Sequence, residues 1–137
     1  MMPCRPHKYW LAGLLFIIVL VISSGASATC NQTQADKGIQ PEMTMCAYDA
    51  YQIADKKLNV AYKNRIKQLG DDDNRVYASK SLQALKQSQK AWLKFRDAEC
   101  HAQAFEYDGG SMQPMIRALC LEALTIERTK QLTPELK

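Results

Sequence analysis

The sequence predicts an all-α fold, a small antiparallel three-helix bundle stapled by two disulfides and preceded by a signal peptide. Apolar residues recur at helical spacing in three long segments, and no segment alternates as a β-strand does. Glycine-containing breaks separate these segments, at Gly70 and at Gly109-Gly110. Short connections of this kind join antiparallel neighbours in helical bundles. The chain of 137 residues suits one small domain.

Residues 1–28 have the features of a secretory signal peptide. A basic start is followed by an apolar run over residues 11–22 and by Ala26-Ser27-Ala28, an A-x-A cleavage site. The apolar run is too short to favour the alternative, an uncleaved anchor helix. The residues before Cys30 also lack the pattern of a lipid-attachment site. We therefore expect a soluble, periplasmic or secreted protein with no stable membrane span after cleavage.

The charge of the remaining chain excludes one class of function. Cleavage would leave residues 29–137, which are 109 residues, and would remove two basic residues and no acidic residue. The net charge would fall from +4 to +2. A nucleic-acid binder shows a concentrated basic face, so we expect no nucleic-acid partner.

Four cysteines remain after Cys4 is removed with residues 1–28, and an even number in an oxidising compartment predicts disulfides. Cys100 and Cys120 lie equally far from Gly110 along the chain. Two antiparallel helices would hold them at the same height, which favours Cys100–Cys120 and leaves Cys30–Cys46. The first reversal brings Cys46 to nearly the height of Cys100, so Cys46–Cys100 with Cys30–Cys120 stays open.

A zinc site is the alternative use of these cysteines. The chain has no CxxC motif, and His101 is the only histidine after residue 28. Ligands are therefore too few for the usual zinc sites, and we expect no metal and no cofactor.

Individual residues set the expected helix boundaries. Residues 29–40 are polar and are predicted as a loop, and Pro41 suits the first turn of the first helix. Gly70 suits the end of that helix, and one of the aspartates at 71–73 suits the cap of the next. The third helix is predicted to be capped by Ser111, to tolerate Pro114 in its first turn and to end before Pro134.

The second helix is predicted to run from about Asn74 to Phe105 and to be the central one. Its expected buried stripe consists of Ala78, Leu82, Leu85, Trp92, Phe95, Ala102 and Phe105.

Polar residues of the three helices fall at similar heights. Counting from the reversals places Asp55 opposite Gln89, and Arg128 opposite Trp92. We expect a partly buried network in which Arg128 donates to Asp55 or to an acid of the second helix. The predicted members are Asp55, Asn59, Gln89, Arg96 and Arg128. Because buried charges must be paired, we interpret this network as a structural clamp rather than a catalytic site.

Catalytic chemistry has little support in the sequence. A glycosidase needs two carboxylates across a cleft, but Asp97 and Glu99 point to different sides of one helix. His101 could serve only as the base for Cys100, whose sulfur is better explained by a disulfide. We therefore expect no catalytic residue and no enzymatic activity.

The second reversal is the candidate partner-binding loop, made of Tyr107, Asp108, Gly109, Gly110 and Ser111. The adjacent disulfide would stiffen this loop, and rigid loops lose less freedom on binding. The alternative interpretation is a plain turn that reverses the chain.

Four segments carry a family resemblance. They are Met43-Thr-Met-Cys46, Ala54-Asp55-Lys-Lys-Leu58-Asn59-Val-Ala-Tyr62, Gln89-Lys-Ala-Trp92-Leu-Lys-Phe95-Arg96-Asp97-Ala-Glu99-Cys100, and Gly109-Gly110-Ser111 with Cys120, Thr125 and Arg128. This combination resembles the LprI-like lysozyme inhibitor family, long classed as a domain of unknown function in exported bacterial proteins. The resemblance covers nearly all of residues 29–137.

The resemblance implies a helical, disulfide-containing envelope domain with no catalytic residues. It also implies a protein that works by binding, with lysozyme or another cell-wall component as partner. A loop inserted in the lysozyme cleft is the expected mode of inhibition. The alternative is a structural or stress-related envelope protein that binds another envelope protein and has no lysozyme activity.

Overall fold

The computed structural model describes residues 29–71 and 73–133. The expected signal peptide and Pro134 lie outside these residues. Within them the chain forms helices and no strand, which confirms the predicted all-α class. The helices are α1 (Gln32–Asp36), α2 (Gln40–Gly70), α3 (Arg75–Phe105) and α4 (Gln113–Leu132).

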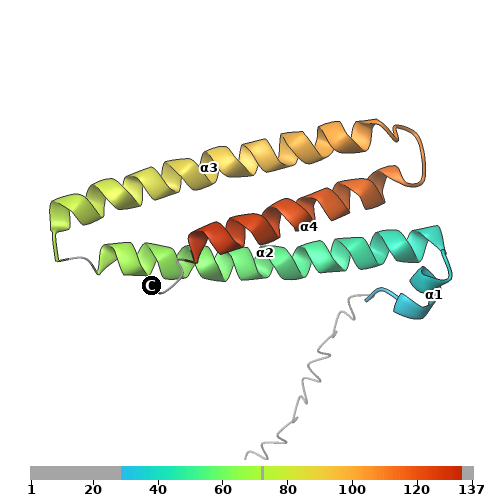
Figure 1. Cartoon of the computed structure of the whole chain (residues 1–137), viewed down its shortest axis with the longest axis horizontal. Helices are drawn as coiled ribbons and strands as arrows, with labels where there is room; N and C mark the ends of the chain where they lie inside the picture. Colours follow the sequence, from blue (N-terminus) through green and yellow to red (C-terminus); the bar gives the residue numbers. More distant parts are fainter. Residues whose placement is uncertain (1–28, 72, 134–137) are drawn as a thin grey trace, which may run out of the picture.

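The three long helices form the predicted antiparallel bundle. The chain reverses between α2 and α3 and again between α3 and α4, so α4 runs in the direction of α2 (Figure 1). Helix α4 packs against both α2 and α3, whereas α2 and α3 touch each other least. The central helix is therefore α4, and the expectation that the second helix would be central is wrong. The far end of the α2–α3 hairpin extends beyond α4, because α2 and α3 have 31 residues each and α4 has 20.

The helix ends agree with the predictions only in part. Pro41 lies in the first turn of α2, as expected. The cap of α3 is Asn74, whose side chain accepts a hydrogen bond from the Tyr77 amide at 3.0 Å, and not one of the aspartates. Ser111 does not cap α4, because it lies inside a turn closed by the Gln113 amide donating to the Gly110 carbonyl at 3.2 Å.

Residues 32–36 form the short helix α1 where the sequence predicts a loop. The side chain of Asn31 accepts a hydrogen bond from the Gln34 amide at 3.2 Å and so caps this helix. Ala35 is buried, and the Cys30 amide donates to the Asp49 carboxylate of α2 at 2.8 Å. Contacts with α2 therefore hold a segment whose own composition is too polar to predict a helix.

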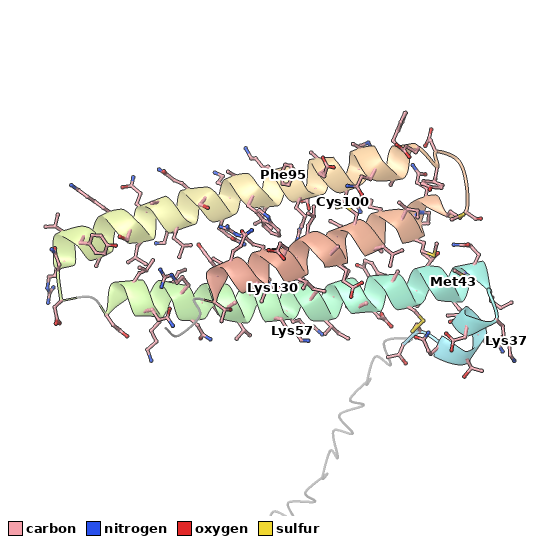
Figure 2. All side chains as sticks on the ribbon, viewed as in Figure 1. Lys37, Met43, Lys57, Phe95, Cys100 and Lys130 are labelled. Carbon is pink, nitrogen blue, oxygen red and sulfur yellow. A yellow bond between two sulfur atoms is a disulfide. The ribbon has the colours of Figure 1, made fainter. Side chains whose placement is uncertain are left out.

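The disulfides are those that the hairpin geometry favoured. Cys30 is bonded to Cys46 with their Cα atoms 4.8 Å apart, and Cys100 is bonded to Cys120 with their Cα atoms 5.4 Å apart. Cys100 of α3 points toward α4 (Figure 2). The first bridge fastens the segment before α1 to α2, and the second joins α3 to α4 next to the loop at residues 106–112.

The core is built mainly from small side chains. Leu58, Thr125 and Cys100 are the largest side chains that are fully buried. Leu58 packs with Ala61 and Leu132, and the partly buried Tyr62, Leu85 and Trp92 cover this cluster. The predicted stripe of the second helix is right for Ala78, which is buried, and for Leu82, Leu85 and Trp92, which are partly buried.

That stripe is wrong for Ala102, which is exposed, and for two aromatic residues of α3. Phe95 is 54 % exposed and Phe105 is 62 % exposed. The buried face of this part of α3 carries Arg96, Cys100 and Ala104 instead. The helix turns this face inward because the charged group and the disulfide both need partners on α4.

Candidate functional site

A buried arginine joins the three long helices. Arg96 of α3 is 6 % exposed. Its Nη1 donates to Asp55 Oδ1 of α2 at 3.1 Å and to Thr125 Oγ1 of α4 at 3.3 Å. Its Nε donates to Asp97 Oδ1 at 3.0 Å, and its Nη2 lies 2.9 Å from the same oxygen. The guanidinium of Arg96, itself on α3, therefore links α2 through Asp55 and α4 through Thr125.

Aromatic rings cover this guanidinium. The Arg96 Cζ atom lies 5.5 Å from the ring centroid of Tyr51 and 5.3 Å from that of Trp92. Burial by itself lowers the pKa of Arg96, but the hydrogen bond to Asp97 and the neighbouring charges outweigh burial and raise it. Burial raises the pKa of Tyr51, although Arg96 acts in the opposite direction. Arg96 is therefore a fixed cation, and Tyr51 is a neutral phenol at physiological pH.

A second arginine also contacts Trp92. Arg128 Nε donates to Gln89 Oε1 at 3.0 Å, and its Nη2 donates to Ser88 Oγ at 2.9 Å. Its Cζ atom lies 5.8 Å from the Trp92 ring centroid. Burial lowers the pKa of Arg128, but an arginine this far above neutrality stays charged. These bonds hold α3 to α4.

The predicted network is thus two clusters that share Trp92. Asp55, Asn59 and Arg96 belong to the first, since Asn59 Nδ2 donates to Asp55 Oδ2 at 3.0 Å. Gln89 and Arg128 belong to the second. The expectation that Arg128 donates to Asp55 or to an acid of the second helix is wrong. Arg128 bonds to Gln89, Ser88 and Gln131, and Arg96 bonds to Asp55 instead. Rise along the helix predicts the height of a residue, but which of two arginines reaches an acid depends on the rotation of α3.

A groove beside the Arg96 cluster was not predicted. It has a volume of about 560 Å³ and lies mainly between α2 and α4. Its wall includes the exposed side chains of Met45 (39 %) and Tyr48 (47 %), together with Tyr51, Arg96 and Arg117. No sequence signal indicated this groove, because only the structure shows that the apolar side chains of Met45 and Tyr48 are exposed. Volume and lining are both typical of small-ligand sites.

The candidate loop at residues 107–111 is exposed throughout and ordered by its own hydrogen bonds. The Gly110 amide donates to the Tyr107 carbonyl at 2.9 Å, and Gln113 Nε2 donates to Asp108 Oδ1 at 3.1 Å. Gly109 has a φ of +73°, a conformation that glycine adopts without strain. The loop is therefore closed by hydrogen bonds within residues 107–113, and its role as a partner-binding loop stays a prediction.

The acidic residues considered for catalysis have other contacts. Asp97 accepts from Arg96, and Glu99 Oε1 accepts from Gln103 Nε2 at 3.0 Å. Within the described part of the chain, no three His, Cys, Asp or Glu side chains gather where a metal ion could be held. None of the helices over residues 29–71 and 73–133 is long and apolar enough to cross a membrane.

Fold and site together define a class: a small helical bundle held by two disulfides and by an arginine that bonds to all three long helices. The sequence profile of the lysozyme inhibitor LprI family matches residues 30–132. The chain belongs to this family, and the match covers every helix described above.

One relative shows how far the similarity extends. The uncharacterized protein R02472 of Rhizobium meliloti (strain 1021) is 38 % identical over 123 residues, which cover 82 % of this chain and 87 % of that protein. No solved structure matches the chain.

Proposed function

We propose that the chain is an exported envelope protein that inhibits lysozyme through the loop at residues 107–111. The observation that carries the proposal is the match to a family named for lysozyme inhibition, which spans residues 30–132. The two disulfides agree with an oxidising compartment outside the cytoplasm. The proposed processing removes residues 1–28.

The chemistry of the loop suits the cleft of a glycosidase. Lysozyme cleaves its substrate with two carboxyl groups that face each other across its cleft. Tyr107 and Ser111 carry hydroxyl donors that can reach carboxylates, and Met112, 40 % exposed, adds apolar contact area beside them. The bridge at Cys100–Cys120 restrains both flanks of the loop, so little conformational freedom is lost on binding.

Local charge supports the proposal better than net charge does. Glu106 and Asp108 lie at the loop and are exposed. Lysozymes are usually basic, so these acids attract them even though the processed chain would have a net charge of +2.

The test is a lysozyme assay on cell walls together with direct binding of the purified protein. Replacing Tyr107 by Ala is expected to weaken binding at least tenfold. Tyr77→Ala is the matched control, because Tyr77 is an exposed tyrosine (57 %) at the far end of α3. Protein that neither slows lysozyme nor binds it would refute the proposal. Equal losses of lysozyme binding in the two variants would show that the loop is not the binding surface.

A second candidate is recognition of a cell-wall saccharide in the groove between α2 and α4. Tyr48 offers an exposed ring face for a sugar ring, and Asp97 and Arg117 offer an acceptor and a donor for its substituents. Titration with N-acetylglucosamine oligomers tests it. Tyr48→Ala should abolish binding if the groove is used, and lysozyme inhibition should not change.

A further inference from the structure

A row of exposed apolar residues runs along α3 outside the bundle core. Phe95 and Phe105 are more than half exposed, and three alanines between and beside them are exposed too. The row is Ala91, Phe95, Ala98, Ala102 and Phe105, with steps of four, three, four and three residues. The same spacing toward the start of α3 includes Ser88, Ala84, Ser81 and Tyr77, of which Ser81 is partly buried and Ser88 accepts a hydrogen bond from Arg128 of α4. We name the first five residues the outer seam.

This spacing is that of a coiled-coil seam. Apolar residues repeated every 3.5 positions keep one narrow stripe of a helix turned toward a partner helix. The bundle does not use the outer seam for its own core, since the buried residues of this part of α3 are Gln89, Arg96, Cys100 and Ala104. Helix α3 therefore has a buried face that contacts α2 and α4 and a separate apolar stripe, the outer seam, that has no partner within the described chain.

We propose that the outer seam pairs with the outer seam of a second copy of this chain, as a parallel, in-register dimer. Phe95 and Phe105 would each meet their counterpart, with two alanine layers between them. Small residues in those layers let the helices approach closely, and the phenylalanines supply the apolar area that leaves water. The proposal concerns assembly and does not depend on the proposed function.

Charges beside the seam favour the same chain as partner. In a parallel pair, the residue just before every second seam position, here the residues before Phe95 and Ala102, faces the residue five places later on the other helix. Lys94 would face Glu99 of the second copy, and His101 would face Glu106. Each pair would form twice because of the two-fold symmetry. Neither Lys94 nor the two glutamates make an ion pair within residues 29–71 and 73–133, so these charges remain available.

The same charges disfavour the antiparallel arrangement. An antiparallel pair brings the residues on one side of the seam against each other. Lys94 would then lie near His101 of the second copy, and neither glutamate would have Lys94 opposite. The parallel direction is favoured because only it brings Lys94 opposite Glu99 of the second copy.

The parallel direction has a consequence for the loop. Both copies of α3 would end at the same side of the dimer, so the two loops at residues 107–111 would project together. A dimer would then present two loops to one cell-wall surface and gain by avidity. This consequence, unlike the dimer itself, rests on the proposed function.

Sedimentation velocity and light scattering of the purified protein from micromolar to near-millimolar concentration test the dimer. The expected mass doubles as concentration rises. Phe95→Ser combined with Phe105→Ser should keep the protein monomeric throughout, and both residues are exposed, so the fold should remain. The matched control is Val60→Ser, an exposed apolar residue (59 %) on α2, which should still dimerise.

A charge exchange tests the direction. Lys94→Glu should weaken the dimer by at least tenfold, and adding Glu99→Lys should restore it. A protein that is monomeric at every concentration would overturn the proposal, as would a dimer unaffected by the two serine substitutions. A dimer that Lys94→Glu does not weaken would overturn the parallel register. Lysozyme inhibition by a monomeric variant is measured separately, so failure of the dimer and failure of the proposed function are distinguishable.

Discussion

Replacing Arg96 by Met is expected to destabilise the protein more than any other single arginine replacement. Methionine keeps most of the side-chain volume but removes every donor. Asp55 and the fully buried hydroxyl of Thr125 would then lose the Nη1 group that bonds to both. The stacked contacts with Tyr51 and Trp92 would weaken as well.

The size of the effect follows from the burial of the partners. Removing one member of a fully buried ion pair costs about 3–5 kcal/mol. The side chains of Asp55 and Asp97 are 35 % and 55 % exposed, so water replaces part of what they lose. We therefore expect a loss of about 2–3 kcal/mol in the free energy of unfolding, at or below the low end of the range for a fully buried pair.

Urea denaturation followed by circular dichroism measures this loss, with Arg117→Met as the matched control. Arg117 is exposed, and its replacement should change stability by about 0.5 kcal/mol or less. Double-mutant cycles with Asp55→Asn add a second check. Asp55 should couple to Arg96 by about 1 kcal/mol or more and should be additive with Arg128. Two results would contradict the prediction: a loss of stability for Arg96→Met no greater than that for Arg117→Met, or a coupling of Asp55 to Arg128 larger than its coupling to Arg96.

The remaining predictions concern the disulfides, the loop and alkaline pH. Mass mapping of non-reduced peptides should recover Cys30–Cys46 and Cys100–Cys120, and a Cys46–Cys100 peptide would contradict the structure. Replacing both Cys100 and Cys120 by Ala should cost about 3 kcal/mol in urea unfolding, because the bridge spans 20 residues, and a loss near zero would contradict that. Gly109→Ala should cost about 1 kcal/mol because φ is +73°, whereas Gly70→Ala, in a helix with no atom closer than 4.0 Å to the new Cβ, should not destabilise; equal losses would be the contrary result. Burial raises the folded-state pKa of Tyr51 above its ordinary value of 10.0, so the protonated phenol stabilises the folded state. This stabilisation is complete below pH 10.0 and is lost as the pH rises through the folded-state pKa. Tyr51→Phe should therefore lose less stability than the parent between neutral pH and pH values above that pKa in the same unfolding assay, and parallel losses would exclude the effect.

Local rules explain why the overall fold could be predicted. Helical periodicity is strong over residues 43–69 and over α4, and glycines mark both reversals. The equal distances of Cys100 and Cys120 from Gly110 favoured the correct disulfide pair, because the rise per residue is the same on both helices. These are properties of the chain that need no knowledge of how the helices rotate.

Rotation about the helix axis is what the sequence left open. The periodicity of α3 fits two stripes, one through Arg96 and Cys100 and one through Phe95 and Phe105. Hydrophobicity alone favours the aromatic stripe. The structure buries the other, because a charged guanidinium bonded to α2 and α4 and a disulfide to α4 fix the orientation.

The same distinction applies to the candidate site. The sequence by itself determined the helical class, the presence of two disulfides and the membership of the polar clusters, although not their partners. Only the tertiary structure decided that Arg96 rather than Arg128 bonds to Asp55, that a groove opens between α2 and α4, and that Phe95 faces solvent. The physical reason is that spacing along a helix fixes height and phase, whereas packing between helices fixes which phase is turned inward.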